Sequence, residues 1–360
     1  MNQLQETLSQ AETLGRDCHV VAPLGTNATI DAGWTTLHEH FHQQTGRLAS
    51  LPVDSSSFPE EVRVAVVDST PHGYDGGEAG QDRLGHGHAI GRIIRELGCP
   101  EGSPACVAQV ANHLALPLVT PTVWDTENGG YFGLQTHLAR AIHSSVSEWR
   151  SYNENLETGA SPQPRLVVNL SLAWDGRYGG AYNVLGDLPA PVRAVHAAIT
   201  HAVCRGALVV AAAGNDPGGP DPVIGPMFPA GWETKAAPTP SDCEDLEGKG
   251  YRDEELYPSF PPPGWSGYRP LVYAVGGVRG DDRPLASTRP GGRPRTAAPG
   301  AHAVAEDANG NAVPTDVLTG TSASTAVVSG IAATVWGYRP ELSGPEVMGL
   351  IRRASVDLGQ

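Results

Sequence analysis

The sequence has few cysteines and no long apolar run, the features that mark zinc-stabilised and membrane-spanning proteins. It contains five cysteines in 360 residues, and no two of them stand in the Cys-x-x-Cys spacing of a zinc site. Cys99 and Cys106 are near enough in sequence to pair, but we expect them to be unpaired thiols. No stretch reaches the roughly 18 consecutive apolar residues that a bilayer-spanning helix needs. We therefore expect no membrane span, and a stability that comes from an ordinary packed core.

Basic residues are also scarce. The 24 Lys and Arg residues stand against 39 Asp and Glu, which gives a formal net charge of -15 at pH 7. Because sequence-independent nucleic-acid binding depends on basic side chains that neutralise phosphates, we expect no nucleic-acid partner. The first residues contain no basic end followed by an apolar run, so no signal peptide is predicted. The expected location is the cytoplasm, with leaderless secretion as the alternative.

Short valine-rich segments dominate the chain from residue 62 onward. The segments 62–67, 166–172, 207–213 and 271–276 are typical of parallel strands that are covered on both faces. Between them, apolar residues recur at steps of three to four, which predicts amphipathic helices. Alternating strands and helices predict an α/β fold: a three-layer, doubly wound, mostly parallel sheet with helices on both faces.

Composition divides the chain into an extension and one domain. Residues 1–60 are polar and mixed, and we interpret them as an N-terminal extension with a regulatory or structural role. Residues 61–360 are predicted to form the α/β domain. An acidic and proline-rich insertion at about 232–270 interrupts this domain, and we expect it to be a solvated loop.

Polar residues follow the predicted strands where a parallel sheet collects functional groups, at the carboxyl ends of its strands. Asp68 comes directly after the first strand, where a carboxylate can orient an imidazole or simply end a turn. His86 lies in Gly85-His86-Gly87-His88, ahead of a helix pattern. Flanking glycines let the backbone approach closely, although a His-Gly-His pair is also compatible with a metal site.

Two further polar residues complete the set. Asn215 follows the strand segment 207–213, and its side-chain amide could stabilise an oxyanion or form a turn. Ser322 precedes a helix of small apolar residues, where an isolated serine is usually an N-cap. Taken together, an acid, a base, an amide donor and a hydroxyl supply the orienter, general base, oxyanion donor and nucleophile of acyl transfer.

The chain resembles the subtilisin-like serine proteases over about residues 62–358. The segments that carry the resemblance are AVVDST, LGHGHAIG, VVNLSLAWD, VVAAAGND and GTSASTAVVSGIAA, and they follow the chain order Asp, His, Ser of that family. The resemblance implies a subtilisin-like fold and a serine endopeptidase that hydrolyses peptide bonds through an acyl-enzyme. It implies Asp68, His86 and Ser322 as the catalytic triad and Asn215 as the oxyanion-hole side chain.

The resemblance also implies a cleft for an extended peptide, which would bind as an added strand between two walls. One wall would be Ser171, Leu172 and Ala173, the opposite wall Gly129, Gly130 and Tyr131, and Ala213 and Gly214 would line the substrate next to Asn215. Ala173 stands where the family commonly has glycine, which implies a slightly tighter primary pocket.

Other expectations concern partners and cofactors. No cofactor or metal is required for the implied chemistry, and a structural calcium ion is compatible with the family without being assignable to residues. An inhibitor or propeptide partner is left open for residues 1–60. The family usually adds a final strand and helix beyond the point that corresponds to Gln360, which leaves a truncated end open.

Two other classes of function compete with the protease. One is a catalytically inactive binding or regulatory protein with the subtilase fold, in which the triad geometry has drifted. The other is a metal site formed by Asp68, His86 and His88, which would leave Ser322 and Asn215 unexplained.

Overall fold

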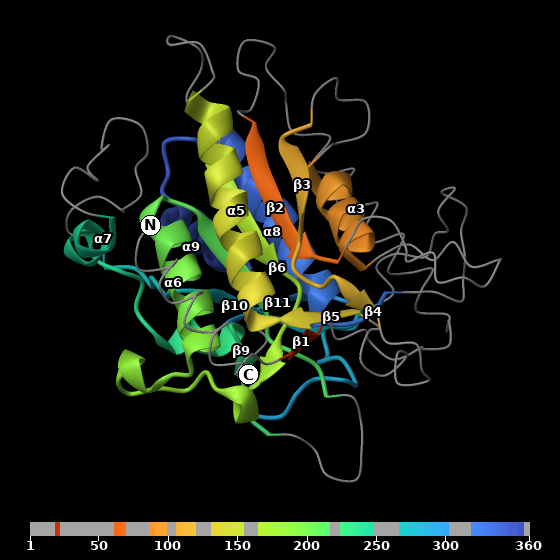
Figure 1. Cartoon of the computed structure of the whole chain (residues 1–360). Helices are drawn as coiled ribbons and strands as arrows, with labels where there is room; N and C mark the ends of the chain where they lie inside the picture. The colour runs from red at the N-terminus through yellow and green to blue at the C-terminus, as the bar shows by residue number, and fades with distance from the viewer. Residues whose placement is uncertain are drawn as a thin grey trace, which may run out of the picture.

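Nine segments of the chain are described by the computed structural model (Figure 1). They are residues 19–21, 61–69, 86–98, 106–119, 131–154, 165–216, 224–247, 266–301 and 318–355. Within these segments, no helix has the length and hydrophobicity needed to cross a bilayer. Gly129 and Gly130 lie outside the described residues, as does most of the N-terminal extension.

A six-stranded sheet forms the centre of the fold. Its order is β11 (Thr296–Pro299), β10 (Tyr273–Val278), β8 (Leu208–Ala212), β6 (Arg165–Leu170), β2 (Val62–Asp68) and β3 (Ala108–Leu114). All five neighbouring pairs are parallel, which confirms the predicted sheet. The four strands predicted from valine-rich segments are β2, β6, β8 and β10. The two edge strands, β3 and β11, are partly exposed and lack a continuous apolar run, so the pattern did not reveal them.

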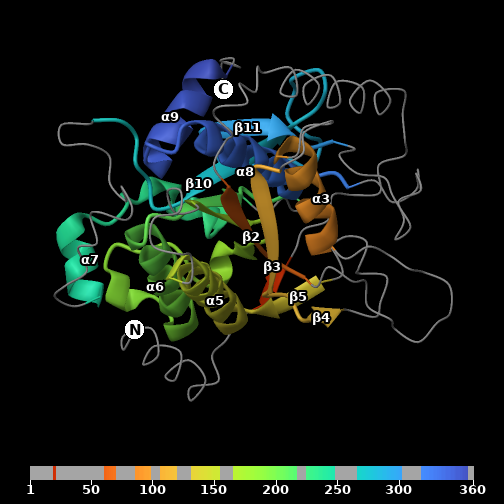
Figure 2. The ribbon, with the colours of Figure 1, turned by 90° about the horizontal axis from the view of Figure 1, so that it is seen from above.

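Helices cover both faces of this sheet, which confirms the three layers (Figure 2). α3 (His86–Gly98), α8 (Thr321–Tyr338) and α9 (Gly344–Ala354) lie on one face, and α5 (Gln135–Glu154) and α6 (Ala190–Cys204) lie on the other. The strands serve both layers because successive side chains alternate: Val64 and Val66 pack toward α3 and α8, whereas Ala65 and Val67 pack toward α5.

Two small antiparallel sheets flank the large one. β5 (Tyr131–Leu134) lies between β1 (His19–Val21) and β4 (Leu118–Val119), and β7 (Trp174–Asp175) pairs with β9 (Met227–Phe228). β1 also contacts β7, so this short N-terminal strand lies between β5 and β7.

The start of the segment that we expected to be a solvated insertion is buried, so the prediction was wrong for this part. The 3-10 helix η3 (Ala230–Thr234) buries Trp232 and Glu233, and it is followed by α7 (Pro240–Glu247). The other 3-10 turns are η1 (Gly176–Tyr178) and η2 (Leu185–Asp187). The apolar ring of Trp232 and the two backbone N–H groups from which Glu233 accepts hydrogen bonds explain why this part folds inward. Residues 248–265 lie outside the described part.

The cysteines also differ from expectation. Cys204 in α6 and Cys243 in α7 form a disulfide with a Cα–Cα distance of 5.5 Å. Cys106 is disulfide-bonded too, so the prediction of a free thiol was wrong for this residue. Sequence spacing could not reveal the Cys204–Cys243 pair, because these two residues, 39 positions apart, are brought together by the packing of α7 on α6.

Candidate active site

Three neighbouring strands deliver polar groups to one edge of the sheet. β2, β6 and β8 lie side by side and run parallel, so their carboxyl ends meet at the same edge. β2 ends at Asp68, β6 is followed by Ser171, and β8 leads through Ala213 and Gly214 to Asn215. Sheet topology thus places three of the predicted site segments together, although they are far apart in sequence.

Asp68 and His86 form a buried pair at this edge. His86 Nδ1 lies 2.8 Å from Asp68 Oδ1, and both side chains are fully buried. Asp68 Oδ1 also accepts a hydrogen bond from the Ser69 backbone N–H at 2.7 Å. The carboxylate is held by a backbone N–H and accepts a hydrogen bond from Nδ1, so the proton of the neutral imidazole stays on Nδ1. The lone pair of the imidazole that can accept a proton is then on Nε2.

The glycine after His86 explains how α3 begins so close to β2. A Cβ atom on Gly87 would lie 2.6 Å from the Ser69 carbonyl oxygen, so a larger residue would push the helix away. The Gly87 N–H donates to Ser69 Oγ at 3.0 Å, which joins the helix start to the residue after Asp68. The His-Gly sequence is therefore required by packing as well as by chemistry.

The second nitrogen of His86 differs from the first. Among the residues that the structure describes, Nε2 has no hydrogen-bond partner although it is buried. Buried polar atoms nearly always have one, and an unpartnered atom of this kind is typical of a place where substrate or a reacting group binds. The imidazole therefore has one nitrogen fixed by Asp68 and one that can accept a proton.

Ser322 lies in the first turn of α8, and its side chain is buried. Its hydroxyl donates to the Ser171 carbonyl at 3.0 Å rather than to His86 Nε2, which has no partner within the described residues. Ser171 Oγ in turn lies 2.9 Å from both the Ser322 carbonyl and Asn169 Oδ1. A hydroxyl has a single proton to donate, so proton transfer to His86 requires the Ser322 hydroxyl to turn away from Ser171.

Asn215 faces the same turn of α8. Its Oδ1 accepts hydrogen bonds from the Thr321 N–H at 3.1 Å and from Thr321 Oγ1 at 3.2 Å. These two donors assign the oxygen to the Thr321 side, which directs the NH2 group the other way. The sequence predicted no role for Thr321, although it stands directly before Ser322 in the motif that predicted the nucleophile.

The predicted cleft walls lie beside these groups. Ser171, Leu172 and Ala173 are fully buried at the end of β6, and Ala213 and Gly214 lie next to Asn215 at the end of β8. Tyr131 is the first residue of β5, and the rest of the opposite wall lies outside the described residues. β5 and β7 adjoin the two predicted walls, and β1 lies between these strands in antiparallel pairing with β5.

An ion pair between the buried Arg289 and the partly buried Asp175 adjoins the predicted Ser171–Ala173 wall, and no sequence pattern indicated it. Arg289 Nη2 donates to Asp175 Oδ2 at 2.7 Å, and Arg289 Nε donates to the Gly225 carbonyl. Burial alone would raise the pKa of Asp175, but hydrogen bonds from the Arg177 backbone and from Arg289 outweigh it and lower the pKa. The pair joins β7 to a residue 114 positions further along the chain.

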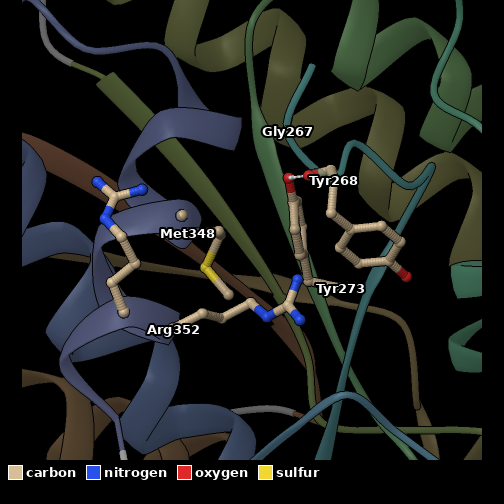
Figure 3. Close-up of a pocket in the computed structure, with 7 residues that line it drawn as sticks. Gly267, Tyr268, Tyr273, Met348 and Arg352 are labelled. Carbon is tan, nitrogen blue, oxygen red and sulfur yellow. Dashed lines mark hydrogen bonds between the residues drawn. The ribbon is translucent and has the colours of Figure 1, made fainter. Parts of the chain in front are cut away.

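A cavity of about 350 Å³ lies elsewhere in the molecule (Figure 3). It is lined by Gly267, Tyr268, Tyr273, Met348, Gly349, Arg352 and Arg353. Tyr273 is the first residue of β10, so the cavity lies toward the amino end of that strand, away from the carboxyl edge that holds Asp68 and Asn215. The predicted site residues that the structure describes do not line it.

The hypothesis of a metal site at Asp68, His86 and His88 gains no support. Within the described part of the chain, no group of three or more His, Cys, Asp or Glu side chains is arranged to hold a metal ion. Residues 70–85, between Asp68 and His86, lie outside that part.

The fold and the site together define a class: an α/β protein with a buried carboxylate–imidazole pair and a helix-start serine at the carboxyl edge of a parallel sheet. Residues 28–360 match the family model described as the subtilase family, and the chain belongs to that family. It is therefore a subtilisin-like serine peptidase, and peptides are its substrates.

Two solved structures with TM-scores of 0.50 support the fold, and a third structure is similar. The serine protease MycP1, described as an essential component of the type VII (ESX-1) secretion system, is 19% identical with a TM-score of 0.50, covering 96% of this chain and 89% of that one. A lanthipeptide protease is 17% identical with a TM-score of 0.50, covering 90% and 89%. MycP1 from Mycobacterium smegmatis is 21% identical with a TM-score of 0.49, covering 94% and 83%. No curated protein sequence matches this chain.

Proposed function

We propose that this peptidase cleaves bonds within peptide chains through an acyl-enzyme on Ser322, with His86 as general base and Asp68 as its orienter. The observation that carries the proposal is the buried Asp68–His86 hydrogen bond of 2.8 Å, which leaves a buried Nε2 without a described partner. A buried nitrogen without a hydrogen-bond partner lowers the free energy of unfolding, so this arrangement does not serve stability. It does suit a general base, which must have a nitrogen available to accept a proton.

The steps follow from these positions. The Ser322 hydroxyl turns from the Ser171 carbonyl to His86 and gives its proton to Nε2 as the Oγ–carbon bond to the substrate forms. The Asn215 NH2 group and the Ser322 N–H, which belongs to the first turn of α8, stabilise the oxyanion. The carbon–nitrogen bond then breaks, and the leaving amine takes the proton from His86. Water then attacks the ester carbonyl and gives a proton to His86, and Ser322 Oγ takes that proton back as the carbon–Oγ bond breaks.

Substrate is proposed to bind as an extended strand between the wall at Ser171–Ala173 and the wall at Gly129–Tyr131. The Ser171 carbonyl, which accepts from Ser322 in the structure, then becomes an acceptor for a substrate N–H. Competition for this one carbonyl would release the Ser322 hydroxyl when substrate binds. No cofactor takes part in these steps, and a structural calcium ion remains a prediction.

The N-terminal segment is proposed to compete with substrate for the cleft. Val21, the last described residue of β1, stands opposite Phe132, which is next to Tyr131 of the predicted wall. β1 is antiparallel to β5 and lies between the strands that adjoin both predicted walls. This placement favours a regulatory role for residues 1–60 over a structural one.

The disulfides bear on the cellular compartment in which the protein works. Cys204–Cys243 and the bonded Cys106 favour an oxidising compartment over the cytoplasm, because thiols stay reduced in the cytosol. We therefore propose secretion rather than a cytoplasmic role. Counting unmodified cysteines by mass spectrometry after alkylation, in protein taken from its native cells, tests this proposal.

Labelling with a fluorophosphonate tests the catalytic assignment. The wild type should be labelled, and Ser322→Ala should not. Ser145→Ala is a matched control, because this serine is also buried and hydrogen-bonded but lies in α5 away from the site. Equal labelling of wild type and Ser322→Ala would contradict the assignment, and absence of labelling in a folded wild type would favour an inactive binding protein.

A further inference from the structure

The side chain next to the cleaved bond must fit between the wall segments described above. If Ser322 attacks a carbonyl whose oxygen turns toward Asn215, the side chain of that substrate residue enters between the ends of β6 and β8. What the space between Ala173 and Gly214 can hold therefore decides specificity, and this inference rests on the proposed function.

Met227 occupies the side of this space that lies against Gly214. A Cβ atom on Gly214 would lie 2.3 Å from Met227 Sδ and 2.6 Å from Met227 Cγ, so the thioether rests directly on the Gly214 backbone. Gly214 has φ +95°, and it immediately precedes Asn215. The buried Met227 side chain therefore lies against the residue directly before Asn215, the proposed oxyanion donor.

Strand alternation shows which way Met227 points. Its neighbour Phe228 belongs to the core beneath the sheet, where its ring lies 6.2 Å from that of Trp174 and 5.8 Å from that of Trp232. Successive side chains of a strand point to opposite faces, so Met227 faces away from this core. It stands opposite Asp175 in the β7–β9 pair, on the side of the substrate wall.

The surrounding loops hold Met227 in place. Arg289 bonds both Asp175 and the Gly225 carbonyl, and the Gly225 N–H donates to the Pro290 carbonyl at 2.8 Å. The segment that leads into Met227 is therefore tied to β7 through the Asp175–Arg289 ion pair. Asp175 also pairs with the exposed Arg177 at 3.1 Å, so its single negative charge faces two guanidinium groups at this end of the space.

We infer that Met227 closes the primary pocket, so that the peptidase accepts a small uncharged side chain, such as that of alanine or serine, at the residue whose carbonyl is attacked. Ala173, which stands where the family commonly has glycine, is expected to narrow the same space further. Large aromatic and long charged side chains are excluded by volume. Met227 is a specificity-determining residue that takes no part in the chemistry.

Diphenyl phosphonates derived from single amino acids test this inference without knowledge of the substrate sequence. Ser322 Oγ attacks phosphorus, the Oγ–P bond forms and phenol leaves, so the inactivation rate reports how well one side chain fits. The alanine-derived reagent should inactivate the wild type at least about tenfold faster than the phenylalanine-derived reagent. Met227→Gly and the milder Met227→Ala should lower this ratio at least about tenfold, whereas Met227→Leu should preserve it.

Met348→Ala is the matched control, since Met348 is fully buried and lies in the distant cavity against Tyr273 (Figure 3). It should lose stability but keep the wild-type ratio. Equal or faster inactivation of the wild type by the phenylalanine reagent would overturn the inference, and so would an unchanged ratio in both Met227→Gly and Met227→Ala. Failure of a plain fluorophosphonate to label the wild type would instead count against the proposed function.

Discussion

Two buried histidines in this chain occupy very different surroundings. His86 has a carboxylate on Nδ1 and no described partner on Nε2. His196 in α6 lies in an aromatic cluster, with Tyr182 OH 2.8 Å from Nε2 and Thr200 Oγ1 3.3 Å from Nδ1. Its ring packs edge-on against Trp232 at 5.0 Å. Burial, helped by the nearby positive charge of Lys235, lowers the pKa of His196 to about 4.

This contrast is the one we expect between the proposed catalytic histidine, His86, and a structural one. Both rings are buried, so burial alone does not identify function. His196 has both nitrogens satisfied by hydroxyl groups and stays neutral, which suits a residue that packs. His86 has the Asp68 carboxylate beside Nδ1 and no described hydrogen-bond partner on Nε2, an arrangement that suits a general base.

The same substitution at both histidines should separate them most clearly. His86→Ala should lower the rate of fluorophosphonate labelling by a factor of about 10⁴ or more, because within the described structure no other group is placed to take the Ser322 proton. His196→Ala should keep labelling near the wild-type rate while lowering the melting temperature. Comparable losses of labelling in two folded variants would break the distinction between the two residues.

Asp68→Asn tests the anion beside His86. It should reduce labelling by a factor of about 10³–10⁴, because an amide can donate to Nδ1 and so stabilise the wrong tautomer. Asp187→Asn, at an exposed position in η2, is the control and should behave as wild type. Retention of full activity by Asp68→Asn would show that His86 does not need its carboxylate.

Acid should destabilise the fold through His196. The pKa is about 4 in the folded protein and 6.5 when the side chain is unperturbed. Between these values the unfolded chain binds a proton that the folded protein does not, so stability is full above pH 6.5 and falls as pH drops toward 4, by about 3 kcal/mol. Urea unfolding at pH 7 and pH 4.5 should show a smaller loss in His196→Gln than in wild type. An equal loss in both proteins would mean that His196 titrates normally.

A weaker effect is expected on access to His86 and Ser322. Val20→Pro should weaken the pairing of β1 with β5, because proline disrupts strand pairing. If the N-terminal segment competes with substrate, labelling should become several-fold faster with an unchanged requirement for His86. A slower or unchanged rate in a folded variant would assign β1 a structural role.

Much of the fold followed from local pattern. Valine-rich runs identified β2, β6, β8 and β10, because strands covered on both faces must be apolar throughout. The edge strands β3 and β11 were missed, because an edge position tolerates polar residues. Trp232 and Glu233 were assigned to a solvated loop, because the acids around them dominate the composition.

Local motifs were enough to predict acyl transfer as the class of chemistry. They supply an acid, a base, an amide donor and a hydroxyl at Asp68, His86, Asn215 and Ser322. Tertiary structure added what no spacing encodes. Parallel order brings β2, β6 and β8 to one edge, packing of α7 on α6 pairs Cys204 with Cys243, and strand alternation turns Met227 toward Gly214. The rest position of the Ser322 hydroxyl also belongs to the structure, because a hydroxyl chooses among acceptors that only the folded chain brings within reach.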